Sequence, residues 1–232
     1  RLVGSEMCIR DRTNTGQNSK RIAKNTLLLY IRMLFMMAVS LYTSRVVLQT
    51  LGVEDFGIYN VVGGVVAMFS VISGSLSAAI SRFITYELGK GDKEKLTRIF
   101  SSSITIQLGL GLIILIIAEA IGVWFLNSKM TIPEGRMYAA NWVLQLSILT
   151  LCFHILQAPY MSVIIAHEKM DVYAYASILE VVMKLIIVYL LQLFAYDKLI
   201  VYACLISLNA FGIFLFYYVY CNKMFSESRY KY

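Results

Sequence analysis

The chain alternates between long apolar runs and short polar hinges. Its first two apolar runs are residues 26–51 and 58–80, and the second run contains no charged residue. Each run exceeds the roughly 20 residues with which a helix crosses a hydrocarbon layer of about 30 Å. The hinge between them must therefore turn the chain outside the lipid. Gly52 and Gly57 are expected to end one helix and to start the next.

The same alternation continues along the chain and predicts six membrane spans. The longest charged linker is residues 81–98, where the chain breaks at residues 89–92 and Asp92 is expected to cap the next helix. Pro159 lies in the fourth span and is expected to kink it, since proline frees a backbone carbonyl one turn earlier. The fold class predicted is an all-α membrane protein, a six-transmembrane-helix bundle. The predicted spans are residues 26–48, 58–80, 103–125, 141–165, 174–194 and 199–220.

Composition excludes an ordinary soluble domain. Hydrophobic residues make up 59% of the chain and charged residues 15%, and the mean hydropathy is +0.68. An ordinary soluble chain has roughly 25% charged residues. The strands of a membrane β-barrel would show alternation in segments of about ten residues, which this sequence lacks. The net charge of +7 lies mostly in short loops, where membrane topology explains it, and we expect no nucleic-acid partner.

Lysine and arginine residues are unevenly shared between the two sides of the predicted bundle, and cytoplasmic loops carry the excess. The side with more of them is therefore expected to be cytoplasmic, with both the N-terminus and the tail on it. That side holds Lys20, Arg21, Lys24, Arg82, Lys90, Lys93, Lys95, Arg98, Lys169, Lys223, Arg229 and Lys231. The opposite side holds Arg45, Lys129, Arg136 and Lys198.

The predicted organisation has four parts. Residues 1–12 resemble a translated sequencing adaptor and are expected to be non-native, with a disordered native tail as the alternative. Residues 13–25 form a cytoplasmic lead-in, and residues 26–220 form the six-helix transmembrane lobe. Residues 221–232 form a cytoplasmic tail, after which we expect the chain to be truncated.

Four charged residues lie well away from the ends of predicted spans, namely Arg32, Glu119, Glu180 and Lys184. A central lysine or arginine costs about 2.5–3.5 kcal/mol on insertion scales, so such residues usually face a protein interior or a solute pathway. Glu180 precedes Lys184 by four residues, which allows an ion pair along one helix. Alternatively, Glu180 turns toward Arg32 and leaves Lys184 free to attract an anion. Both arrangements are compatible with the sequence.

The sequence predicts no catalytic centre and no metal site. His154 lies alone in the fourth span and His167 lies in a loop, and neither has the spacing of a metal-binding motif. Both are expected to be satisfied structural residues. Small residues in the second span, among them Gly63, Gly64 and Gly74, are expected to allow close helix packing or a sliding contact. Pro159 is the other candidate hinge.

Three segments resemble one family of membrane transporters. They are TSRVVLQTLGVEDFGIYNVVGG at residues 43–64, SRFITYELGKGDKEKL at residues 81–96, and QAPYMSVIIAHEKMDVYAYASILEVVMKL at residues 157–185. The chain from residue 25 to residue 220 is similar to the N-terminal half of Wzx-like flippases. These form the polysaccharide-biosynthesis branch of the MATE/MOP exporter superfamily.

The resemblance implies one six-helix lobe of a two-lobe transporter in the bacterial cytoplasmic (inner) membrane. Such transporters move undecaprenyl-diphosphate-linked oligosaccharide between leaflets for surface polysaccharide or lipopolysaccharide (O-antigen) synthesis. The expected partners are this lipid-linked oligosaccharide, membrane lipids and other polysaccharide-assembly proteins. Arg32 and Lys184 would then bind the diphosphate, and Glu180 or Glu119 would couple transport to H⁺ or Na⁺. No other cofactor is expected.

Three alternatives remain open at this point. A MATE-type drug or cation antiporter would require an acidic cavity. A membrane-embedded glycosyl or acyl transferase acting on lipid-linked sugar would need acidic or histidine residues clustered on a long outer loop. The longest outer loop, residues 126–140, has Glu134 and no histidine. A scaffold subunit without a solute path is the third alternative.

Overall fold

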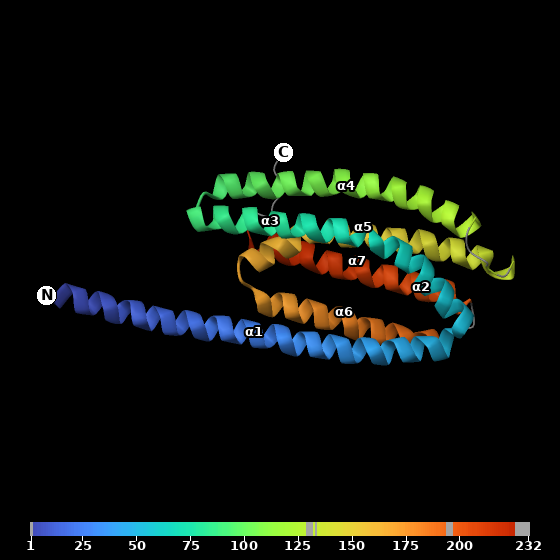
Figure 1. Ribbon diagram of the computed structural model, residues 1–232, viewed down its shortest axis with the longest axis horizontal. Coiled ribbons are helices and arrows are strands. Elements are labelled where there is room, and N and C mark those ends of the chain that lie inside the picture. The colour runs from blue at the N-terminus through green and yellow to red at the C-terminus, as the bar shows by residue number, and fades with distance from the viewer. Residues whose placement is uncertain (1, 129–131, 133, 194–196, 226–232) are drawn as a thin grey trace.

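The computed structural model describes residues 2–128, 132, 134–193 and 197–225 of the chain. All regular structure in these ranges is helical, which confirms the predicted fold class. The helices lie side by side, and α1 extends well beyond the others toward the N-terminus (Figure 1). In chain order they are α1 (Leu2–Leu51), α2 (Val53–Met68), α3 (Ser70–Lys90), α4 (Lys93–Ser128), the 3₁₀ helix η1 (Glu134–Arg136), α5 (Met137–Ala166), α6 (Met170–Leu191) and α7 (Lys198–Met224).

Among the described residues, five helices are long and apolar enough to cross a membrane. These segments are Thr26–Leu51 of α1, Glu94–Ser128 of α4, and the whole of α5, α6 and α7. They correspond to five of the six predicted spans. The lead-in before residue 26 continues α1 without a break.

The predicted second span is not one continuous helix. It breaks at Phe69, where α2 ends and α3 begins, so the span predicted over residues 58–80 contains parts of both helices. The Ser70 hydroxyl donates a hydrogen bond to the Ala67 carbonyl over 2.6 Å and so competes with the helical backbone bonds. Gly63 and Gly64 further weaken the helix before the break. Average hydropathy over the run could not reveal this interruption.

The helix ends at the first hinge were predicted only in part. Gly52 adopts a φ of +85°, a left-handed value that glycine tolerates, and it separates α1 from α2. Gly57, in contrast, lies inside α2, so its predicted role at a helix end is wrong. Beside Gly52, the acidic residues Glu54 and Asp55 occupy the first turn of α2, where negative charge is favourable.

The predicted charged linker over residues 81–98 is helical except for a short turn. α3 continues to Lys90, and Gly91 then adopts a φ of +76° and ends the helix. The Asp92 carboxylate accepts a hydrogen bond from the backbone N–H of Lys95 over 3.1 Å, which confirms the predicted cap. This bond lowers the pKa of Asp92 below its usual range. The predicted break at residues 89–92 is confirmed, and the charged residues on either side of it lie on the ends of α3 and α4.

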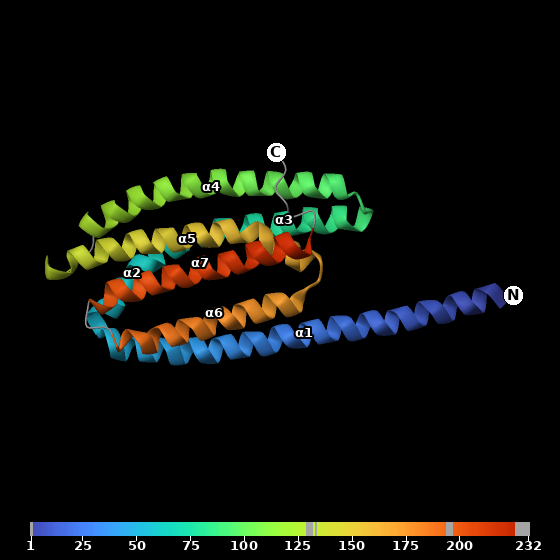
Figure 2. The same cartoon turned by 180° about the vertical axis from the view of Figure 1, so that it is seen from behind.

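The turns alternate between the two ends of the bundle, as the six-span prediction requires. The α1–α2 turn, η1 and the start of α7 lie at one end, which we call the outer end (Figure 1). The α3–α4 turn, the α5–α6 turn and the end of α7 lie at the other end, and the view from behind agrees (Figure 2). Trp124 and Trp142, near the end of α4 and the start of α5, are both exposed close to the outer end.

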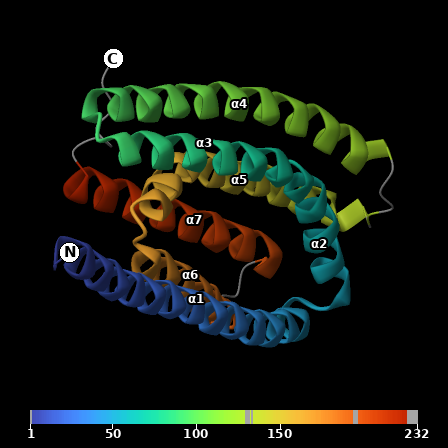
Figure 3. The same cartoon turned by 60° about the vertical axis from the view of Figure 1, so that its left-hand side comes forward.

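α5 is the central helix of the bundle and packs against α2, α3, α4, α6 and α7. α5 and α7 lie between α4 on one side and α1 on the other (Figure 3). Helix α1 packs mainly on α6, and its apolar side chains remain open; Leu34 and Leu41 are 66% and 70% exposed. An apolar surface of this kind requires lipid or another helix bundle to cover it.

The glycines of the predicted second span do not mediate close helix contacts. A Cβ atom added at Gly63, Gly64 or Gly74 would meet no atom within 4 Å, so the predicted close packing at these positions is wrong. Close contact occurs instead at Gly122 of α4, where a Cβ atom would lie 2.7 Å from Cδ1 of Leu144 on α5. Gly63, Gly64 and Gly74 therefore face open space in the described part of the structure.

Candidate functional site

Arg32 contacts the neighbouring helix through a single aromatic residue. Its guanidinium carbon lies 4.2 Å from the centre of the Tyr173 ring on α6, and its Nη2 donates a hydrogen bond to the Tyr173 hydroxyl over 3.2 Å. The Nε atom is buried and has no hydrogen-bond partner. Among the described residues, no carboxylate pairs with Arg32. The half-buried guanidinium thus retains its positive charge and a free donor.

Lys184 and Glu180 form an ion pair along α6. The Lys184 Nζ lies 2.7 Å from Oε1 of Glu180, and their side chains are 38% and 20% exposed. Of the two arrangements compatible with the sequence, the structure has the one in which Glu180 neutralises Lys184. Lys184 is therefore not the free cation that the alternative arrangement required. Asn209 of α7 reaches the Glu180 backbone carbonyl over 3.5 Å and joins α7 to this position.

The ion pair and Arg32 belong to one polar region within the bundle. Tyr217 of α7 is buried in the neighbourhood of Arg32, Tyr173 and Glu180. On the other side, His154 of α5 lies in the neighbourhood of both Glu180 and Lys184. Side chains from α1, α5, α6 and α7 thus converge here. Because Glu180 and Lys184 cancel, Arg32 gives the region a net positive charge.

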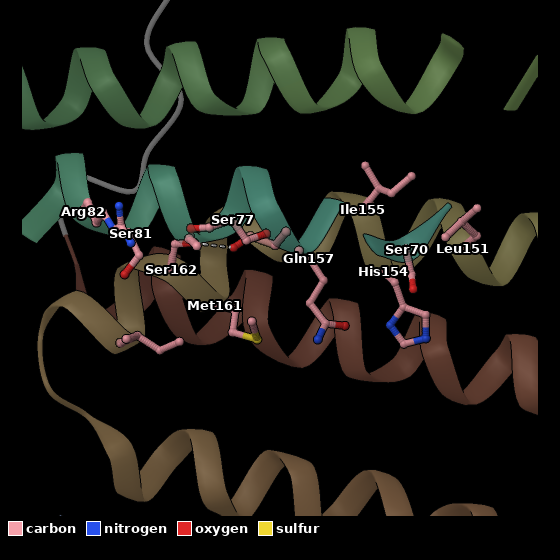
Figure 4. Close-up of a pocket in the computed structure, with 14 residues that line it drawn as sticks. Ser70, Ser77, Ser81, Arg82, Leu151, His154, Ile155, Gln157, Met161 and Ser162 are labelled. Atoms are coloured by element: carbon pink, nitrogen blue, oxygen red, sulfur yellow. Dashed lines mark hydrogen bonds between the residues drawn. The ribbon is translucent and has the colours of Figure 1, made fainter. Parts of the chain in front are cut away.

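Two cavities lie beside this region and share three lining residues, Ser70, Leu151 and His154. The larger cavity, of about 590 Å³, lies between α3 and α5. The smaller one, of about 280 Å³, is lined by α2, α3, α5 and α7. His154, Gln157 and Met161 project from α5 to one side, whereas Ile155 projects to the other side, toward α4 (Figure 4).

The sequence interpretation missed the importance of His154 and Gln157. His154 was expected to be a satisfied structural residue, but its side chain is exposed and lines both cavities. The sequence contained an indication of this site, because His154 and Gln157 are polar residues one helical turn apart in an apolar span, just before Pro159. His167 fits the structural interpretation, since its Nδ1 lies 3.0 Å from the Val163 carbonyl oxygen and its ring packs on Phe225.

The other predicted site residues lie apart from Arg32 or act only as scaffold. Glu119 of α4 accepts a hydrogen bond from Gln145 of α5 over 2.6 Å, and none of its described contacts involves Arg32 or Lys184. Pro159 is buried inside α5, which continues to Ala166, and its role as a hinge stays a prediction. Gly74 lines the larger cavity and Gly63 the smaller one. Within the described ranges, no three His, Cys, Asp or Glu side chains converge on a possible metal position.

At the outer end, Arg136 bridges two aspartates from different turns. Its Nη2 lies 3.1 Å from Oδ2 of Asp55, and its Nη1 lies 3.0 Å from Oδ2 of Asp197, which also caps α7. Burial raises the pKa of Asp55 above its usual range, and Arg136 opposes this shift. Asp197 and Glu54 add to the increase through their negative charges. The cluster ties the α1–α2 turn to the start of α5 and the start of α7.

Arg136→Ala is expected to lower the thermal stability of the chain in detergent at pH 7, by about 1.5–3 kcal/mol for the lost charged hydrogen bonds. The raised folded-state pKa of Asp55 means that the fold favours its protonated carboxyl. Protonated Asp55 therefore adds to the free energy of unfolding at low pH, and this contribution is lost as the pH rises through its folded-state pKa. The loss in Arg136→Ala should therefore shrink as the pH is lowered from 7 toward the pKa of Asp55. Asp55→Asn should cost less than Arg136→Ala at pH 7. Arg98→Ala, an exposed arginine on α4, is the control, and equal melting shifts in both arginine variants at pH 7 would contradict this account.

Comparison with known proteins agrees with the architecture. The MatE family model matches residues 29–190, which is more than half of the chain. The chain is also similar to the uncharacterized membrane protein EpsK of Bacillus subtilis (strain 168), with 28% identity over 98 residues. That match covers 42% of this chain and 19% of the EpsK length, so the matched region spans about a fifth of that relative. No solved structure matches significantly.

The chain belongs to the MatE family. Its long apolar helices and this membership make it a multi-pass membrane protein of a transporter family.

Proposed function

We propose that this lobe takes part in moving undecaprenyl-diphosphate-linked oligosaccharide across the bacterial cytoplasmic membrane. The observation that carries the proposal is the half-buried guanidinium of Arg32, which has a free Nε and no carboxylate partner among the described residues. A multiply charged anion loses much of its hydration in a membrane protein, and a fixed guanidinium offsets part of that cost. Lys184 would help to bind the diphosphate once its ion pair with Glu180 opens, or it would donate a hydrogen bond to the diphosphate while the pair stays closed.

The charge balance distinguishes this proposal from cation export. A drug or cation antiporter would require an unpaired carboxylate in the region around Arg32. Glu180 is the described carboxylate there, and its Oε1 lies 2.7 Å from Lys184. The net charge of the region is therefore positive, which disfavours an organic cation. In the proposal, Glu180 is also the group that takes up H⁺ or Na⁺, since it is the carboxylate paired with Lys184 in this region.

The lobe is proposed to act together with a second lobe. Alternating access in transporters with repeated halves moves one half against the other around a central site. The exposed apolar surface of α1 supports this proposal because it offers a large area for such a contact. We further propose that the N-terminus and the tail face the cytoplasm, since the lysine and arginine excess lies at that end.

The proposal is tested in liposomes that contain the protein encoded by the complete coding region around this sequence. A fluorescent undecaprenyl-diphosphate oligosaccharide is placed in both leaflets, and a membrane-impermeant quencher reports its movement between them. The protein should accelerate the exchange well above the rate in empty liposomes. Export of an organic cation with no acceleration of lipid exchange would favour the antiporter alternative and overturn the proposal.

A further inference from the structure

The cavity between α3 and α5 has polar lining groups that are neutral or positively charged. Among the described residues that line it there is no carboxylate. The rest of the lining is mainly apolar, with Leu151, Ile155 and Ile165 among it. A concave, largely apolar pocket with a few convergent hydrogen-bonding groups is typical of a small-molecule site. The polar lining residues are Ser70, Ser77, Ser81, Arg82, His154, Gln157 and Ser162.

Gln157 provides an independent indication of a ligand. The residue lines the cavity (Figure 4) and is only 8% exposed, and its Oε1 has no hydrogen-bond partner. A buried amide oxygen without a partner costs about 1–3 kcal/mol, and native structures satisfy nearly all such groups. A ligand hydroxyl that donates to this oxygen would remove the cost.

The other polar groups define what such a ligand would be. The hydroxyl of Ser162 donates to the carbonyls of Ser77 and Ala158 over 3.2 Å and 2.9 Å, so this part of the wall is already ordered. The Gln157 amide both donates and accepts hydrogen bonds, and the His154 ring adds further hydrogen-bonding nitrogens. They suit a hydroxyl-rich ligand. Arg82 allows that ligand to carry an acidic group, whereas a cation would find no carboxylate.

We infer that this cavity binds the glycan portion of the transported lipid, next to the region where Arg32 binds the diphosphate. The inference rests on the proposed function, because it assigns the glycan of the same lipid substrate to this cavity and the diphosphate to Arg32. His154 connects the two places, since it lines the cavity and lies in the neighbourhood of the Glu180–Lys184 pair. Gln157 and His154 are the glycan-binding residues in this assignment.

Filling the cavity tests the inference with a matched control. Gly74 lines the cavity and Gly64 does not, yet a Cβ atom at either would meet nothing within 4 Å. Gly74→Leu therefore places a side chain in the cavity, and Gly64→Leu makes the same change on α2 outside it. Both changes raise helix propensity, so folding should be preserved. Gln157→Leu removes the amide without adding much bulk.

The measurement compares two ligands on the chain in lipid nanodiscs, undecaprenyl diphosphate with and without a short attached oligosaccharide. The glycan should tighten binding to the unmodified chain and to Gly64→Leu by about tenfold. Gly74→Leu should abolish this gain and Gln157→Leu should reduce it several-fold, while affinity for undecaprenyl diphosphate stays unchanged. An equal gain in Gly74→Leu, or no gain in the unmodified chain, overturns the inference and leaves the proposed function standing. Failure of both lipids to bind overturns the proposed function and this inference with it.

Discussion

Arg32→Ala should weaken the binding of undecaprenyl diphosphate to the chain by about 10- to 100-fold, which corresponds to about 1.5–3 kcal/mol for charged hydrogen bonds. The reason is that Arg32 supplies an unpaired positive charge where α1 contacts α6, with a free Nε and a position over the Tyr173 ring. Arg32→Lys should retain part of the affinity, since lysine keeps the charge but loses the planar donor geometry. Binding is measured by titration of the chain in lipid nanodiscs.

Arg45→Ala provides the control because Arg45 lies on the same helix, is exposed, and sits toward the outer end. It should leave the affinity within about twofold of the unmodified chain. Thermal melting of the three variants separates loss of binding from loss of structure. A folded Arg32→Ala chain with unchanged affinity would show that the diphosphate does not bind at Arg32.

Glu180→Gln is expected to destabilise the chain by about 2–3 kcal/mol, because it leaves the Lys184 charge inside a membrane helix without a partner. The double variant Glu180→Gln with Lys184→Met should recover most of this loss, since a neutral pair has no buried charge to compensate. Thermal unfolding in one detergent measures both variants.

Glu119→Gln is the matched control for that change. Glu119 also lies in a membrane helix, but it accepts a hydrogen bond from Gln145 and none of its described contacts is with a cation. Its replacement should therefore cost much less than that of Glu180. If the double variant at positions 180 and 184 proves no more stable than Glu180→Gln alone, the ion pair does not neutralise Lys184 in the membrane.

The course of the helices was predictable because lipid leaves few choices for the backbone. Every N–H and C=O group must be satisfied within the segment, so an apolar run such as Met170–Leu191 has to be a helix. The turn at Gly91 and the cap at Asp92 followed from local chemistry. The break at Phe69 was not predicted, because it depends on weak helix formers and on one serine hydroxyl rather than on hydropathy.

The candidate site was less predictable because its contacts join helices far apart in the sequence. The Glu180–Lys184 pair could be predicted as one of two arrangements, since both residues lie on one helix one turn apart. The contact between Arg32 and Tyr173 could not be predicted from the sequence, because it requires α1 to pack beside α6. The cavity at Gln157 depends in the same way on the distance between α3 and α5.

The central claim is that a positive site inside this bundle receives a lipid diphosphate. It is tested most directly by comparing the affinities of the unmodified chain for undecaprenyl diphosphate and for undecaprenol, which has the same chain without the charge. The account predicts at least about tenfold tighter binding of the diphosphate, the value expected for a charged hydrogen bond to Arg32. Equal affinities, or tighter binding of an organic cation of similar size, would contradict it.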